Sequence, residues 1–184
     1  QGGLGNQLFQ WAYGLSLSKN YHVKYNVSNY QTDNGNGVIP NRNLCIEKLL
    51  KKPLSKCIIN EGVVHEGYWQ SEDFFLNLRN EILSLIKVSV KKNFNFKESC
   101  SLHVRRGDYL KLQHIYEVLD ENHYFKCLDK INPKGNIFIF SDEIAWCKKI
   151  FKGNQFVFME DNEPEEDLIY ISLCKDNIIS NSTF

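Results

Sequence analysis

Residues 100–109 read CSLHVRRGDY, and this stretch decides the fold prediction. Its first five residues form a short, mostly apolar run that is typical of a buried strand, and two arginines end it. Further strand patterns follow at 136–140, 155–159 and 178–179. Helical patterns lie between the strands, at 122–131, 144–151 and 165–174. Because strands alternate with helices, we predict an α/β fold with a parallel sheet covered on both faces.

The N-terminal half has a less regular pattern. Apolar spacing predicts helices over 7–19, 43–51 and 71–87. Short strands are predicted over 21–27, 57–60 and 63–68. The polar stretch at 88–99 is typical of a linker. We therefore predict two domains, one at 1–95 and one at 96–184.

Composition excludes several classes of protein. The 184 residues are 42% hydrophobic and 24% charged, with a formal net charge of zero. The chain thus lacks the basic excess of a nucleic-acid binder, and we expect binding at a local site. The sequence contains no run of about 18 apolar residues, so it predicts no membrane span. None of the six cysteines lies within four residues of another, which excludes zinc-ligand spacing, and we expect reduced thiols.

The two ends of the sequence look like cuts through a longer protein. Residue 1 is glutamine rather than methionine and directly precedes a glycine-rich motif. At the other end, Phe184 follows a polar pair at which a helix would begin. We therefore expect the chain to be truncated at both ends.

The arginine pair is the strongest candidate for chemistry. Arg105 and Arg106 follow a predicted strand, at the edge where parallel α/β sheets bind ligands. Guanidinium groups bind phosphate oxygens bidentately, and a diphosphate leaving group needs such neutralisation. Asp108 could brace one arginine, and His103 lies at the mouth of the same site. The alternative is a surface arginine pair after a core strand.

Three other segments carry weaker signals. The opening GGLGNQ, residues 2–7, could bring backbone N–H groups close to an anion, although Leu8 breaks the dinucleotide fingerprint. The alternative there is a tight turn before a helix. Ser141 and its two acidic neighbours could face a nucleotide or could only cap a helix. Residues 180–184 (SNSTF) place hydroxyl and amide groups after a buried strand and could form a second anion site.

The acidic run at 160–167 suggests a metal site as an alternative. Asp161 and Glu163 have the spacing of a DxD-type ligand pair for Mg²⁺. A solvated loop followed by an acidic helix N-terminus after Pro164 explains the same pattern. We favour the second interpretation and predict no metal ligands.

Five segments, taken in order, resemble the α-1,2-fucosyltransferase family. They are GGLGNQLFQWAYG (2–14), GYWQSEDFF (67–75), HVRRGDY (103–109), FIFSDEIAWCKKIF (138–151) and EEDLIYISLCKDNIISNSTF (165–184). The resemblance implies a GT-B-like fold with two facing Rossmann-like domains. It assigns GDP-fucose to the C-terminal domain and the acceptor to the N-terminal one. It also implies that no metal or other cofactor is required.

The resemblance also assigns residues. Arg105 and Arg106 would hold the leaving diphosphate, and Asn6 would lie near the transferred fucose. The other residues expected to bind substrate are Gly3, Gly5, His103, Asp108, Tyr109, Ser141, Asp142, Asn181, Ser182, Thr183 and Phe184. The sequence departs from the family pattern at Glu143, where a second aspartate is usual, and at Asp176, where histidine is usual.

The implied reaction transfers L-fucose from GDP-fucose to the 2-hydroxyl of a galactoside, with inversion. A base would deprotonate the acceptor. The carboxylates considered for this role in the N-terminal half are Asp33, Glu66, Glu72 and Asp73. None of them is singled out by its sequence context. The alternatives are an enzyme of similar architecture with another nucleotide sugar and an inactive nucleotide- or sugar-binding module.

The resemblance also implies partners and a location. The acceptor would be a galactose-terminated glycan or a glycolipid, and a glycolipid would imply peripheral association with a membrane. A bacterial enzyme of this kind is expected in the cytoplasm, at the inner face of the membrane. A Golgi membrane location stays open because the N-terminus is expected to be missing.

Overall fold

The computed structural model describes residues 3–27, 44–57 and 62–184, and the chain divides into two compact units. The first unit extends to Val88 and also includes Thr183 and Phe184. The second unit extends from Ser89 to Ser182. The assignment of acceptor and donor roles to 1–95 and 96–184 remains a prediction.

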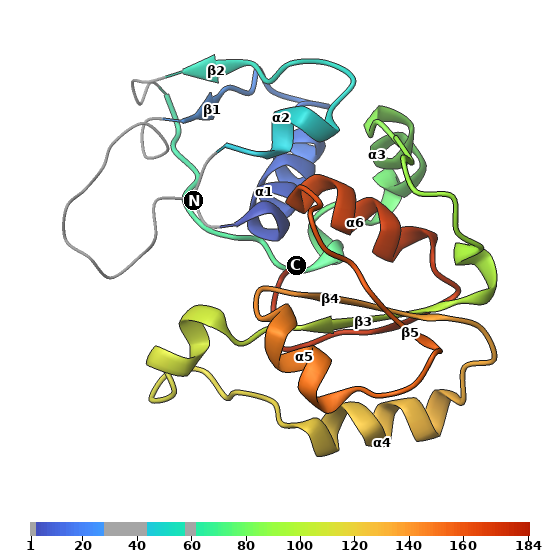
Figure 1. Cartoon of the computed structure of the whole chain (residues 1–184). Coiled ribbons are helices and arrows are strands. Elements are labelled where there is room, and N and C mark those ends of the chain that lie inside the picture. The colour runs from blue at the N-terminus through green and yellow to red at the C-terminus, as the bar shows by residue number, and fades with distance from the viewer. Residues whose placement is uncertain (1–2, 28–43, 58–61) are drawn as a thin grey trace. The chain divides into compact units, whose positions relative to one another are not determined.

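A parallel sheet forms the centre of the second unit (Figure 1). Its strands are β3 (Cys100–Val104), β4 (Ile137–Ser141), β5 (Phe156–Phe158) and β6 (Asp176–Ile178). They lie in the order β5-β4-β3-β6, and every neighbouring pair is parallel. The predicted strands and their parallel pairing are therefore confirmed, with β6 starting two residues earlier than expected.

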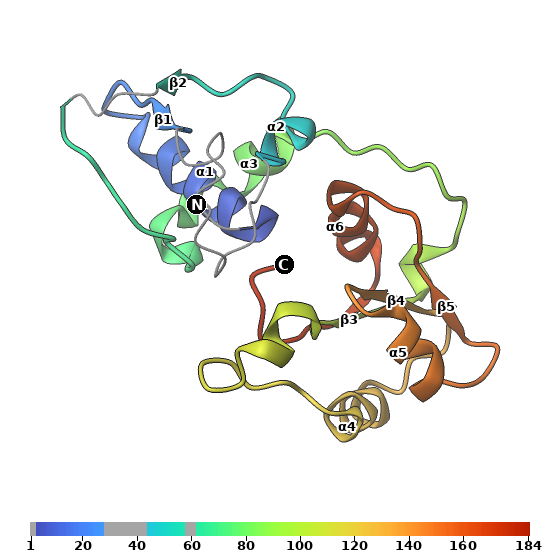
Figure 2. The ribbon, with the colours of Figure 1, turned by 60° about the vertical axis from the view of Figure 1, so that its left-hand side comes forward.

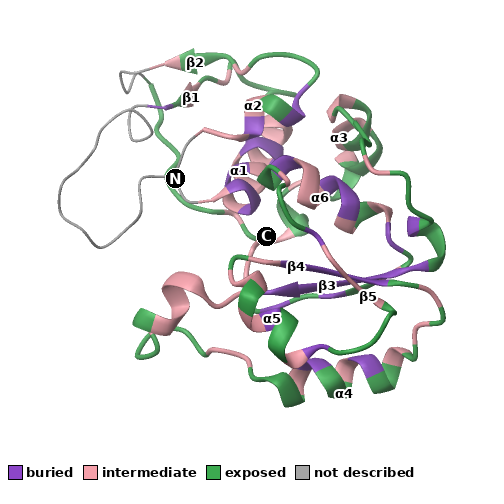
Figure 3. Ribbon diagram, in the orientation of Figure 1, coloured by how far each residue is buried: buried purple, intermediate pink, exposed green. Residues whose placement is uncertain are grey.

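Helices cover both faces of this sheet, as predicted. The helices α4 (Glu121–Ile131) and α5 (Ile144–Ile150) lie on one face, and α6 (Pro164–Leu173) lies on the other (Figure 2). Alternation along β4 explains the two layers: Ile137 and Ile139 pack with α4 and α5, whereas Phe138 and Phe140 pack with α6. The inner strands are buried almost throughout (Figure 3).

The strand order creates a topological switch point between β3 and β6. The chain runs from β3 to β4 and β5 through helices on one face, and it returns through α6 on the other face to β6. This is the order of the first four strands of the doubly wound Rossmann-like sheet. Ligands of such sheets bind outside the carboxyl ends of the strands at the switch point. The residues that follow β3 and β6 are therefore the candidates for binding a ligand.

The first unit is built on α1 (Leu4–Leu17). Its other elements are β1 (Tyr25–Asn26), α2 (Ile46–Leu49), β2 (Lys56–Cys57), the 3₁₀ turns η2 (Glu72–Phe74) and η3 (Leu76–Leu78), and α3 (Arg79–Leu85). β1 and β2 pair in parallel. The buried Gln7 accepts hydrogen bonds from the backbone N–H groups of Cys45 and Ile46, at 2.9 and 3.0 Å, and so fixes the start of α2 on α1.

Several predictions in this unit are wrong. The strand expected at 63–68 does not form, because Gly62 and Gly67 have φ angles of 77° and 156° that break an extended run. The single helix expected over 71–87 is divided into η2, η3 and α3, since Phe75 has a φ of −149°. The strand predicted over 21–27 shrinks to β1, and most of the one predicted over 57–60 lies outside the described residues.

Two further properties concern the cysteines and the lengths of the helices. All six cysteines are free thiols, and Cys100, Cys147 and Cys174 are buried. Within the described residues, every helix is too short or too polar to cross a membrane.

Candidate functional site

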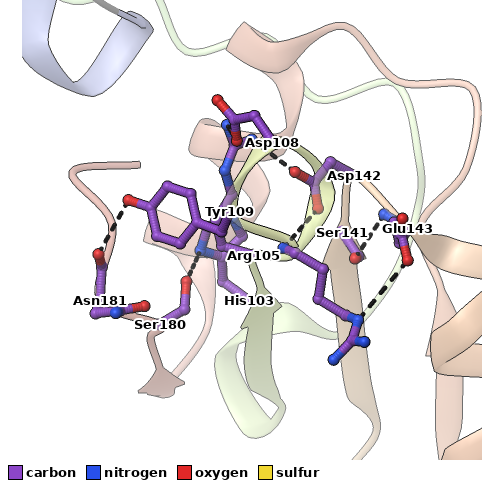
Figure 4. Close-up of polar contacts among 10 residues, drawn as sticks. His103, Arg105, Asp108, Tyr109, Ser141, Asp142, Glu143, Ser180 and Asn181 are labelled. Atoms are coloured by element: carbon purple, nitrogen blue, oxygen red, sulfur yellow. Dashed lines mark hydrogen bonds and ion pairs between the residues drawn. The ribbon is translucent and has the colours of Figure 1, made fainter. Parts of the chain in front are cut away.

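Polar residues follow three neighbouring strands at the same edge of the second unit's sheet. Arg105 follows β3, Asp142 follows β4, and Ser180 and Asn181 follow β6 (Figure 4). Arg106 is the next residue after Arg105. The residues come from positions up to 76 apart in the chain, and parallel pairing brings them to one place. The structure thus brings together most of the residues predicted for the second domain.

Arg105 is held by two carboxylates. Its Nη2 lies 2.5 Å from Oδ1 of Asp108, and its Nη1 lies 2.7 Å from Oδ2 of Asp142. The side chain is 19% exposed, so this three-residue cluster is largely shielded from solvent. The predicted brace from Asp108 is present, and Asp142 provides a second one. Both arms of the guanidinium are thereby fixed in orientation.

Arg106 points in a different direction and is held less tightly. Its guanidinium lies over the ring of Trp146, 4.1 Å from the centroid, and its Nε lies 3.7 Å from Oε2 of Glu143. The buried Nε has no hydrogen-bond partner among the described residues. Its backbone N–H donates to Oδ1 of Asp142 at 3.0 Å. Both terminal nitrogens of Arg105 thus contact carboxylates, whereas the Nε of Arg106 lacks a hydrogen-bond partner among the described residues.

Gly107 is required by the close approach of Asp142. A Cβ atom at position 107 would lie 2.4 Å from Oδ2 of Asp142 and 3.0 Å from its carboxyl carbon. The carboxylate cannot move away freely, because Arg105 and the backbone of Arg106 both hold it. Glycine is thus the only residue that fits without disturbing the arginine cluster.

We expect Gly107→Ala to destabilise the protein by about 1–3 kcal/mol, the usual cost of overpacking. The free energy of unfolding from denaturant titration measures this cost. In an Asp142→Ala background, the further change at Gly107 should cost little, because the clashing carboxylate is gone. Equal costs in both backgrounds would show that Asp142 is not the obstacle.

His103 is buried on the face of β3 opposite Leu102 and Val104. Its Nδ1 lies 3.1 Å from the hydroxyl of Ser180, which links β3 to the segment after β6. Burial lowers the pKa of His103 to about 4; the Asp142 carboxylate opposes this shift, and the Arg105 cation adds to it. The imidazole is therefore neutral at pH 7 and adds no positive charge to the site.

Tyr109 and Asn181 form a second link across the switch point. The phenol of Tyr109 donates to the backbone oxygen of Asn181 at 3.3 Å. Burial raises the pKa of Tyr109, which keeps the phenol protonated as a donor. The amide of Asn181 in turn donates to the backbone oxygen of Glu117 at 2.9 Å. These contacts tie the segment after β3 to the segment after β6.

Other predicted residues have local roles. The hydroxyl of Ser141 accepts a hydrogen bond from the N–H of Glu143 at 2.9 Å, so it stabilises the turn before α5. Glu163 forms a capping box with Glu166 at the start of α6, as the alternative to a metal site predicts. Groups of three or more potential metal ligands are absent from the described residues.

The glycine-rich opening differs from the prediction. α1 begins at Leu4 rather than at residue 7, so Gly5 and Asn6 lie in its first turn and not in a loop before it. The buried Leu4 extends the apolar face of the helix by one turn. Gly3 caps α1 without a side-chain hydrogen bond, and the side chain of Asn6 accepts from Gln70 at 2.7 Å.

The remaining candidates are distributed between the units. Ser182 ends the second unit, whereas Thr183 and Phe184 group with the first. Residues 180–184 are themselves irregular rather than helical. Among the carboxylates considered as a base, the exposed Glu66, Glu72 and Asp73 lie in the first unit, and Asp33 lies outside the described residues.

Sequence reasoning did not identify Trp146 or Tyr116. Trp146 supports Arg106, and its signal was an aromatic residue in the first turn of the helix that follows Ser141. Tyr116 stacks on Tyr109 with ring centroids 4.4 Å apart. It lies in a segment of mixed polar and apolar residues between a strand and a helix, where no sequence pattern distinguished it.

Comparison with known proteins identifies the family. The family described as glycosyl transferase family 11 matches residues 60–184, which is more than half of the chain. The chain belongs to glycosyl transferase family 11. The predicted resemblance to α-1,2-fucosyltransferases is therefore confirmed at the level of the family.

Two proteins from Escherichia coli are similar to this chain. An alpha-1,2-colitosyltransferase is 30% identical over 240 aligned positions, which cover 100% of this chain and 82% of the relative. The O-antigen biosynthesis glycosyltransferase WbnK is 32% identical over 126 positions, covering 63% of this chain and 40% of the relative. No solved structure matches the chain. The arginine cluster lies inside the part that matches glycosyl transferase family 11.

Proposed function

We propose that this chain transfers L-fucose from GDP-fucose to the 2-hydroxyl of a galactoside, with inversion and without a metal ion. Membership of glycosyl transferase family 11 supports the transferase class. The name of the colitosyltransferase relative supports an α-1,2 linkage. The complete enzyme would have the GT-B arrangement of two facing Rossmann-like domains, with residues 96–184 binding the donor.

The observation that carries the proposal is the pair of guanidinium groups at the carboxyl end of β3. A sugar nucleotide leaves as a nucleoside diphosphate, so negative charge accumulates on the phosphate oxygens in the transition state. Arg105 and Arg106 lie at the switch point, where doubly wound sheets bind ligands. Two fixed cations at this place suit a diphosphate better than a neutral ligand.

The two arginines would contribute unequally to stabilising the leaving diphosphate. The carboxylates of Asp108 and Asp142 offset the charge of Arg105 and fix its orientation. Arg106 lies over Trp146, and its Nε has no hydrogen-bond partner among the described residues. We infer that Arg106 makes the larger contribution to the leaving diphosphate and that Arg105, whose charge the two carboxylates offset, contributes mainly a fixed orientation.

The reaction would proceed by one in-line displacement. The oxygen of the acceptor 2-hydroxyl attacks the anomeric carbon of fucose, and the bond from that carbon to the β-phosphate oxygen breaks. The electron pair of this bond remains on GDP, where the arginines stabilise it. A carboxylate would accept the acceptor proton, and Glu66, Glu72 and Asp73 are the described carboxylates considered for this role.

Colitose is the alternative donor sugar, because the first relative is named a colitosyltransferase. Colitose differs from L-fucose in lacking the hydroxyl at carbon 3. A site that hydrogen-bonds this hydroxyl rejects the deoxy sugar strongly, whereas a site without such a contact accepts both. A donor screen with GDP-fucose, GDP-mannose and nucleotide-activated colitose distinguishes these cases. We expect the highest kcat/KM with GDP-fucose, and faster transfer from the colitose donor would overturn that choice.

The acceptor and the location are part of the proposal. We propose a galactose-terminated glycan or glycolipid as the acceptor, in line with the role in O-antigen biosynthesis that the name of WbnK gives for that relative. A glycolipid acceptor would bring the enzyme to the inner face of the cytoplasmic membrane by peripheral association.

Removal of divalent metals should leave the activity intact. The arginines would supply the positive charge that a metal ion provides in other transferases. Glu163, the second acid of the DxD-type pattern, caps α6. The initial rate of the full-length protein with GDP-fucose should be unchanged in excess EDTA. Loss of activity in EDTA that Mn²⁺ or Mg²⁺ restores would contradict this prediction.

A further inference from the structure

A pair of stacked tyrosines extends the candidate site beyond the arginine cluster. Tyr109 belongs to the 3₁₀ helix η5 (Gly107–Lys111), and Tyr116 follows in the next turn. Their ring centroids are 4.4 Å apart and their planes differ by only 10°. The guanidinium carbon of Arg105 lies 5.3 Å from the centroid of Tyr109. Tyr116 is thus separated from the arginine cluster by a single aromatic ring.

This pair is held firmly to the sheet. The backbone N–H groups of Ile115 and Tyr116 donate to the carbonyl of Leu112, at 2.8 and 2.9 Å, and close the turn that presents the ring. On either side of the turn, Tyr109 and Glu117 bond to Asn181 after β6. Tyr116 is therefore fixed in place by contacts on both sides, and it does not depend on the other unit.

The exposure of Tyr116 is unusual for a ring that is fixed in this way. Tyr116 is 41% exposed and its neighbour Ile115 is 62% exposed. Tyr109 cannot offer the same surface, because Tyr116 covers one of its faces and Arg105 lies close to the ring. An exposed aromatic ring held rigidly beside cationic groups is the arrangement with which proteins bind a base and its phosphates together.

We propose that Tyr116 is the stacking platform for the base of the nucleoside diphosphate. The phosphates would lie at Arg105 and Arg106, and the base would pack on the exposed side of the Tyr116 ring. The length scale fits, since only the Tyr109 ring separates the platform from the guanidinium of Arg105. This inference rests on the proposed function, because it needs a nucleoside diphosphate as the leaving group. It adds a base subsite made of a residue that no sequence motif marks.

The test is calorimetric titration of the full-length protein with GDP and, separately, with inorganic pyrophosphate. Tyr116→Leu should weaken GDP binding by roughly fivefold to a hundredfold, the range for loss of one stacked base. Pyrophosphate binding should be unchanged, because it has no base. Tyr116→Phe should bind GDP as the wild type does, since the ring is kept. Tyr21→Leu replaces a tyrosine that is 68% exposed in the first unit and serves as the matched control.

Tyr116→Trp gives a second readout that does not depend on removing the ring. Because Trp146 lies at the arginine site in the wild type as well, the readout is the difference between variant and wild type: GDP should quench the variant more, and pyrophosphate should quench both equally. The proposed stacking is overturned if Tyr116→Leu binds GDP like the wild type, if it loses both ligands equally, or if Tyr116→Phe fails as well. Failure of the wild type to bind either GDP or pyrophosphate would instead contradict the proposed function on which the inference rests.

Discussion

Arg106→Lys is expected to lower kcat about a hundredfold in the full-length protein while its fold is retained. Lysine keeps the positive charge but loses the planar fork that can bind two phosphate oxygens and stack on Trp146. Loss of one well-placed donor to a developing anion costs roughly 3 kcal/mol. The affinity for GDP-fucose should change less than kcat, because the charge on the leaving group grows toward the transition state.

Arg105→Lys should lower kcat strongly as well, for a related reason. A lysine at this position lacks the two terminal nitrogens through which Arg105 holds Asp108 and Asp142 separately, so the brace of the turn after β3 would be weakened. Steady-state kinetics with GDP-fucose measure both effects, and circular dichroism checks the fold. Arg79→Lys, at an exposed position of α3, is the matched control and should behave as the wild type. If both lysine variants at the site turn over at near wild-type rates, the arginines are not the donor clamp.

The second large effect is a dependence of stability on pH that comes from His103. Burial lowers its pKa in the folded protein to about 4, whereas an unfolded histidine titrates near 6.5. Between these values the unfolded chain binds a proton that the folded chain does not. The free energy of unfolding should therefore fall as the pH is lowered from about 6.5 to about 4, by on the order of 3 kcal/mol in total.

Asp167 has the opposite influence in part of the same range. Burial raises the pKa of its carboxyl to about 6, so its contribution to stability falls as the pH rises from about 3.8 to 6. The two effects partly cancel in the wild type, and a variant is needed to separate them. In His103→Gln, which cannot titrate, the pH dependence that arises from His103 should disappear.

The measurement is denaturant unfolding of wild type and His103→Gln at a series of pH values from 4.5 to 7.5. The free energy of unfolding of the wild type minus that of His103→Gln should decrease as the pH falls. Only the wild type takes up a proton at position 103 when it unfolds in this range. A difference that is constant across this range would show that His103 is not held in its neutral form by burial.

The sheet of the second unit was predictable because its signals are local. Each strand is a short apolar run bounded by polar residues, and the helices between the strands have clear apolar faces. The position of Arg105 and Arg106 at the carboxyl end of β3 followed directly from these patterns.

The partners of the site residues could not be predicted from local patterns. The contact between Arg105 and Asp142 depends on β4 lying beside β3, and the contact between His103 and Ser180 depends on β6 returning to the other side. Strand order is a property of the whole fold, and no residue of β6 encodes it alone. The support of Arg106 by Trp146 was missed for the same reason.

The first unit was predicted less well because its segments depend on contacts rather than on periodicity. The segment 63–68 was a strand candidate, but Tyr13 of α1 instead stacks on the nearby Trp69, with centroids 4.4 Å apart. Trp69 adopts a φ of 47°, a left-handed conformation that no propensity favours for tryptophan. Packing against α1 has therefore overridden the local preference of this segment.

Product analysis tests the central claim most directly. The full-length protein is incubated with GDP-fucose and a panel of β-galactosides, and the products are examined by mass spectrometry and by nuclear magnetic resonance. The account predicts a product heavier by one deoxyhexose residue, with fucose α-linked to the 2-oxygen of galactose. A folded protein that binds GDP but forms no fucosylated product, or that forms a β-linked one, would contradict it.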